Sequence, residues 1–85
     1  MDIRYTKTAQ KYIEKLPRDY KQLIKKGIEG LAENPPKGDI KNMEGYKDGR
    51  MRLRVGKFRV IFKYENDNTI YILVMEVGSR GDIYK

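Results

Sequence analysis

The stretch GRMRLRVGKFRVIF, from Gly49 to Phe62, decides the fold, because apolar and basic residues alternate in it on both sides of a Gly-Lys pair. Alternation with a period of two is typical of β-strands, and two such runs around a short turn indicate a hairpin. If Gly56 and Lys57 form the loop, Val55 faces Phe58 and the other pairs follow. This register predicts one apolar face, formed by Met51, Leu53, Val55, Phe58, Val60 and Phe62.

The other face of the predicted hairpin is basic. Like charges directly opposite each other across strands destabilise a sheet by about 0.2–1 kcal/mol per pair, so we infer that a function retains them. Arginine carries a planar fork that suits bidentate phosphate binding. The alternative is a solvated basic surface that only discourages aggregation between sheet edges. No acidic residue lies between Gly49 and Tyr64, and the positive side chains of this face are Arg50, Arg52, Arg54, Arg59 and Lys63.

The rest of the chain predicts two helices and two more strands. DIRY, residues 2–5, is a short strand, and Thr6 caps a helix that Pro17 ends. A second helix runs from about Arg18 to the NPP sequence at 34–36, and the Gly- and Pro-rich segment 35–48 is a long loop. The later strands are 50–55, 58–64 and 69–77, with ENDN at 65–68 as a turn. We therefore expect one α+β domain over residues 1–85, with a mostly antiparallel four-stranded sheet and the helical hairpin on one face.

Composition excludes several classes of site and partner. The 85 residues include 19 Lys and Arg against 12 Asp and Glu, a net charge of +7 that favours polyanionic partners. The absence of cysteine and histidine excludes disulfides and zinc sites built from those residues, and we expect no metal or cofactor. The N-terminus lacks a signal-peptide core, and the longest apolar run, residues 70–75, is too short to span a membrane. We expect a soluble cytoplasmic protein.

Two residues after the last predicted strand complete the set of candidates. Arg80 and Tyr84 follow residues 69–77 closely, within reach of the basic face if that strand is central in the sheet. Alone, they would be interpreted as a solvated charge and a packing aromatic residue.

The segments RMRLRVGKFRVIF and VMEVGSRGDIYK resemble the RelE side of the RelE/ParE superfamily of small toxins. They look like its strand pattern G-x-[YF]-R-[VL]-[IV]-[YF] and its closing V-G-x-R…[IV]-Y, and the resemblance covers essentially the whole chain. It implies a toxin that cleaves mRNA in the ribosomal A site without a metal. Arg50 and Arg52 would then contact the scissile phosphate, and Arg59 would stabilise the transition state. Arg80 would act beside Arg59, and Tyr84 would stack on or orient the substrate.

The general base is open at this stage. RelE enzymes have lysines where this chain has Arg50 and Arg52, and arginine stays protonated, so it is a poor base. Without histidine, the acid of another branch of the superfamily is also missing. Lys57 or Lys47 could serve if desolvated, ribosomal RNA could contribute, or charge stabilisation could suffice. The residues expected to bind RNA are Arg54, Lys57, Lys47 and Lys63.

The resemblance also implies partners. They are a cognate antitoxin with an acidic or amphipathic segment, mRNA on the ribosome and ribosomal RNA, with no membrane. The rival interpretations are a ParE-like inhibitor of DNA gyrase, which shares the fold and acts by binding, and a nucleic-acid-binding relative without catalysis.

Overall fold

The computed structural model describes residues 1–79 and contains the predicted hairpin in the predicted register. Strand β3 (Met51–Val55) pairs antiparallel with β4 (Phe58–Asp67), so that Val55 faces Phe58 and Met51 faces Phe62. Gly56 in the turn has a φ of 58°, a left-handed value that glycine adopts without a steric penalty. The short turn therefore fixes which residues of the hairpin share a face.

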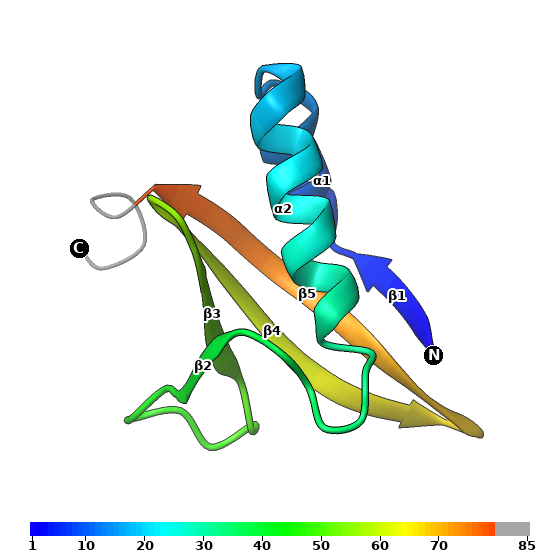
Figure 1. Cartoon of the computed structure of the whole chain (residues 1–85). Helices are drawn as coiled ribbons and strands as arrows, with labels where there is room; N and C mark the ends of the chain where they lie inside the picture. The colour runs from blue at the N-terminus through cyan, green and yellow to red at the C-terminus, as the bar shows by residue number, and fades with distance from the viewer. Residues whose placement is uncertain (80–85) are drawn as a thin grey trace.

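The other elements complete two layers (Figure 1). In chain order they are β1 (Asp2–Tyr5), α1 (Lys7–Glu14), α2 (Arg18–Gly30), β2 (Asp39–Asn42) and β5 (Thr69–Ser79). Within residues 1–79 the strands form one five-stranded sheet in the order β1-β5-β4-β3-β2, with β1 parallel to β5 and the other neighbours antiparallel. Both helices lie on one face, α1 over β5 and α2 over β3 (Figure 1). The predicted α+β class with a helical hairpin on one face is confirmed.

The number of strands and two boundaries differ from the prediction. Strand β2 lies inside segment 35–48, which was expected to be a loop, and pairs antiparallel with β3. Its sequence, DIKN, holds a single apolar residue, so backbone pairing rather than an apolar pattern makes it a strand. The ENDN segment is not a turn, because β4 continues to Asp67 and the chain reverses at Asn68, whose φ is 66°. Asparagine tolerates this conformation better than most residues.

A β-bulge interrupts the pairing of β4 with β5. Ile61 faces Glu76 while the next residue, Phe62, faces Val74, so Met75 is an extra residue on β5. An extra residue reverses the face on which the following side chains lie. The bulge is held from outside the sheet by Thr6, whose hydroxyl donates to the Met75 carbonyl oxygen at 2.6 Å.

The core lies between the helices and the apolar face of the hairpin. Thr6 fixes the start of α1, because its hydroxyl oxygen also accepts from the Ala9 N–H at 3.1 Å. Tyr64 links the layers through its hydroxyl, which donates to the Leu31 carbonyl oxygen at 3.0 Å. The most deeply buried side chains of this core are those of Ala9, Ile24, Ile28, Leu31, Leu53, Phe58, Val60, Phe62, Ile72 and Val74.

Gly27 sets how closely α2 approaches the sheet. A Cβ atom at this position would lie 2.7 Å from Cγ2 of Val55, closer than van der Waals contact allows. Glycine in a helix interior lowers stability by about 1 kcal/mol relative to alanine, so the close approach explains why the helix keeps it.

We expect Gly27→Ala to lower the free energy of unfolding by about 1–2 kcal/mol, because overpacking against Val55 outweighs the gain in helix propensity. Denaturant unfolding measures this change. In the background of Val55→Ala, which removes the clashing methyl groups, the same substitution should become neutral or stabilising. A single Gly27→Ala variant as stable as the parent would show that the contact does not constrain the helix.

Candidate phosphate-binding site

The face of the sheet opposite the helices carries the basic side chains of the hairpin, and we call it the arginine face. Arg52 and Arg54 project from β3, Arg50 directly precedes that strand, and Arg59 and Lys63 project from β4. The register places Arg54 opposite Arg59 and Arg52 opposite Ile61. The structure therefore brings together these five residues, as the alternation predicts.

Two of these arginines are buried rather than solvated. Arg52 is 8% exposed and Arg59 is 4% exposed, and the Nε of each is buried without a hydrogen-bond partner. Arg59 donates through Nη1 to the carbonyl oxygen of Phe58 at 3.3 Å, and Arg52 through Nη2 to Asp39 at 3.1 Å. A buried donor without an acceptor is unfavourable and usually marks a missing partner. For a guanidinium, that partner is an anion.

Carboxylates from other parts of the chain neutralise most of the arginine face. Asp39 of β2 lies 3.1 Å from Arg52 and 3.8 Å from Arg54. Lys63 lies 3.7 Å from Asp48 and 3.4 Å from Glu65. The fold therefore supplies acids that the hairpin sequence itself lacks. Among residues 1–79, Arg59 is the basic residue of this face without a carboxylate partner.

The loop before β3 holds Arg50 in a fixed orientation. Asp48 accepts from Nη2 of Arg50 at 2.8 Å and from its Nε at 3.1 Å, and Cζ of Arg50 lies 4.2 Å from the centroid of the Tyr46 ring. The hydrogen bonds from Arg50 lower the pKa of Asp48 to about 2, so this carboxylate is ionised at neutral pH. Sequence reasoning missed Asp48 and Tyr46, although both lie within four residues of Arg50.

Lys57, one of the two candidate bases, does not join the arginine face. The Nζ of Lys57 lies 4.4 Å from the centroid of the Tyr20 ring of α2, so the ammonium group is on the helix side of the sheet. Lys47 is exposed in the loop before β3. The predicted site residues Arg80 and Tyr84 lie outside the residues that the structure describes.

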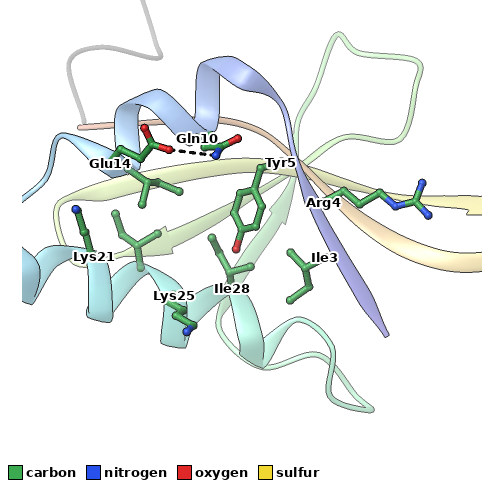
Figure 2. Close-up of a pocket in the computed structure, with 10 residues that line it drawn as sticks. Ile3, Arg4, Tyr5, Gln10, Glu14, Lys21, Lys25 and Ile28 are labelled. Atoms are coloured by element: carbon green, nitrogen blue, oxygen red, sulfur yellow. Dashed lines mark hydrogen bonds between the residues drawn. The ribbon is translucent and has the colours of Figure 1, made fainter.

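A second feature lies on the helix side, between β1, α1 and α2. It is a pocket with a volume of about 530 Å³, and Figure 2 shows Tyr5 reaching from β1 toward Ile28 of α2. Burial raises the pKa of the Tyr5 hydroxyl. Isoleucines supply most of the apolar lining of the pocket, and two lysines of α2 also line it: Ile3, Ile13, Ile24, Ile28, Lys21 and Lys25. The sequence analysis did not anticipate this pocket.

Residues 1–79 contain neither a membrane-spanning helix nor a cluster of metal ligands. No helix in this range is long and apolar enough to cross a membrane. No group of three acidic side chains in the same range is placed to hold a metal ion.

Comparisons with known proteins agree with the observed fold and also identify the family. The archaeal RelE–RelB complex from Pyrococcus horikoshii is 25% identical and superposes with a TM-score of 0.75, covering 95% of this chain and 96% of that chain. The RelB–RelE antitoxin–toxin complex from Methanococcus jannaschii is 30% identical over 95% of this chain and 94% of that chain, with a TM-score of 0.69.

The isolated E. coli RelE toxin is similar in fold, with a TM-score of 0.70 at 21% identity over 98% of this chain and 89% of that chain. A search of curated protein sequences found no significant match. The family model described as "ParE toxin of type II toxin-antitoxin system, parDE" matches residues 3–84, which is nearly the whole chain. The chain therefore belongs to the RelE/ParE superfamily of toxins of type II toxin–antitoxin systems.

Proposed function

We propose that the protein is a RelE-like endoribonuclease that cleaves mRNA in the ribosomal A site and thereby stops translation. The observation that carries this proposal is the buried guanidinium of Arg59, whose Nε has no acceptor and which no carboxylate among residues 1–79 neutralises. A toxin that acts only by binding a protein has no need for an unpaired buried charge. A phosphate that becomes more negative during the reaction would supply the missing acceptor.

The proposed reaction is an in-line attack of a ribose 2'-oxygen on the adjacent phosphorus. The bond from phosphorus to the 5'-oxygen breaks, which leaves a 2',3'-cyclic phosphate and a free 5'-hydroxyl. Arg59 and Arg80 would stabilise the extra negative charge of the phosphorane, and Arg52 would orient the phosphate through its own free Nε. Tyr84 would position the base or the leaving group.

Arg50 has a more limited role in this proposal than the resemblance implies. Its Nε and Nη2 are both engaged by Asp48, so one edge of the fork is not free to hold a phosphate. Arg50 would then contribute charge and a fixed surface beside the half-exposed Tyr46 ring. Arg54, Lys47 and Lys57 are exposed and would contact ribosomal RNA, and Lys63 would contact the RNA from within the arginine face.

The proposed partner on the helix side is a cognate antitoxin with an acidic, amphipathic segment. Relatives of this chain form complexes with an antitoxin, RelB. The pocket between β1, α1 and α2 offers isoleucine side chains to an apolar face and Lys21 and Lys25 to acidic groups. We therefore place part of the antitoxin in this pocket, separate from the arginine face.

A second candidate function is inhibition of DNA gyrase. The matching family model is described as a ParE toxin. A ParE-like toxin would act by binding gyrase, without cleaving RNA. A toxin that binds nucleic acid without catalysis is the third candidate. Incubation with programmed ribosomes and, separately, a gyrase supercoiling assay distinguish these functions: cut mRNA favours the proposal, and inhibited supercoiling with intact mRNA favours the gyrase inhibitor.

We expect Arg59→Ala to reduce A-site cleavage about 10²–10³-fold, the usual effect of removing a donor that stabilises a transition state, and Tyr84→Ala to reduce it as well. Arg59→Met should reduce cleavage to the same extent but leave the free energy of unfolding unchanged or raised by up to about 4 kcal/mol, because an apolar group replaces a buried, unsatisfied charge. Arg18→Met, at an exposed position of α2, is the matched control. If Arg59→Ala and Tyr84→Ala cut like the parent, the site assignment is wrong.

We expect the double substitution Lys21→Glu and Lys25→Glu to weaken antitoxin binding about 10-fold or more at low salt, through loss of attraction and added repulsion. Calorimetric titration with the cognate antitoxin gives the affinity. Lys7→Glu with Lys26→Glu makes the same change in net charge at exposed helix positions outside the pocket. Equal weakening by both pairs would show that the pocket is not a docking site.

A further inference from the structure

The general base is the one chemical role that the arginine face leaves open. A base must accept the proton of the 2'-hydroxyl, so guanidinium groups are unsuitable. Of the two lysines considered as bases, Lys57 lies against Tyr20 on the helix side, and Lys47 is exposed in the loop before β3 with no contact to an arginine of this face. The acceptor must therefore be sought among the carboxylates of the arginine face.

Three of these carboxylates are already occupied by ion pairs. Asp39 binds Arg52 and Arg54, Asp48 binds Arg50 and Lys63, and Glu65 binds Lys63. The low pKa of Asp48, about 2, makes that group an especially weak proton acceptor. Glu76 differs, since it is exposed and forms no ion pair with any of residues 1–79.

The register of the sheet places Glu76 beside the two arginines with a free Nε. Ile61 of β4 faces Glu76 on one side and Arg52 on the other, so these three residues form one row across the arginine face. Arg59 faces Gly78, two residues further along β5, and is thus the diagonal neighbour of Glu76. Diagonal neighbours in a sheet are about 7–8 Å apart at Cα, a distance that two long side chains can bridge through one bound phosphodiester.

The charge of Glu76 also acts on the far side of the site. Together with Asp48 and Tyr46, it raises the pKa of Arg50. The carboxylate therefore lies within electrostatic range of the arginine that precedes β3.

We propose that Glu76 is the general base of the cleavage reaction. The carboxylate takes the proton of the 2'-hydroxyl, the 2'-oxygen forms a bond to phosphorus, and the 5'-oxygen leaves with the electron pair of the broken bond and takes a proton from water. Arg59 and Arg52 hold the phosphate oxygens during the transfer. This assignment rests on the proposed function, and it gives the reaction an acceptor in place of the lysines that RelE enzymes have.

The test uses the full chain on programmed ribosomes under single-turnover conditions. Glu76→Gln keeps the shape of the side chain and removes the proton acceptor, so we expect a loss of at least about 100-fold in the cleavage rate. Formate added to Glu76→Ala should restore part of the rate, because a free carboxylate can occupy the vacated position. Glu29→Gln, on the exposed side of α2, is the matched control and should cut like the parent.

Binding is measured separately with an mRNA whose scissile ribose lacks the 2'-hydroxyl. A base is not needed for binding, so Glu76→Gln should bind this mRNA on the ribosome as tightly as the parent or more tightly. Unchanged cleavage by Glu76→Gln overturns the assignment while leaving the proposed function intact. A loss of binding that matches the loss of rate, or a Glu76→Ala variant that formate does not restore, also overturns it. A parent protein that does not cut mRNA overturns both the proposed function and the base.

Discussion

The alternation along β4 links Arg59, the most deeply buried charged residue within residues 1–79, to the hydrophobic core. Arg59 lies between Phe58 and Val60, and both neighbours are almost entirely buried under the helices. Because successive residues of a strand point to opposite faces, the packing that fixes these two side chains also fixes the guanidinium on the other face. The unfavourable burial of an unsatisfied donor is tolerated because the hydrophobic burial on the helix side offsets it.

The elements that local pattern controls could be predicted from the sequence. The hairpin register followed from period-two alternation and a Gly-Lys turn, and the helix start followed from the cap at Thr6. Strand β2 and the ion pairs of Asp39 could not be predicted in the same way. Asp39 is 13 residues from Arg52 in the chain, and only the antiparallel pairing of β2 with β3 brings them together. The side of the sheet on which Lys57 lies could not be predicted either, because the side chain of a turn residue can point to either side of a sheet.

The fold places basic side chains on two separate surfaces, the arginine face and the pocket on the helix side. On the arginine face, carboxylates neutralise most of the basic groups and leave Arg59 without a carboxylate partner among residues 1–79. On the helix side, Lys21 and Lys25 adjoin an apolar pocket, an arrangement suited to a protein segment rather than to a phosphate chain. Overall charge therefore only favours a polyanionic partner, whereas the pairing of individual charges distinguishes the neutralised basic residues from Arg59.

The bulge at Met75 determines which side chains at the end of β5 lie on each face of the sheet. If β5 continued without the extra residue, Val60 would face Glu76 and Ile61 would face Met75, so the carboxylate would enter the core and a thioether would replace it among the arginines. The hydroxyl of Thr6, at the start of α1, holds this irregularity in place. One extra residue in the strand therefore sets the face on which every following side chain of β5 lies. An insertion or deletion of one residue between Leu73 and Glu76 would exchange the two faces of the end of β5, although the residues beyond it stay the same.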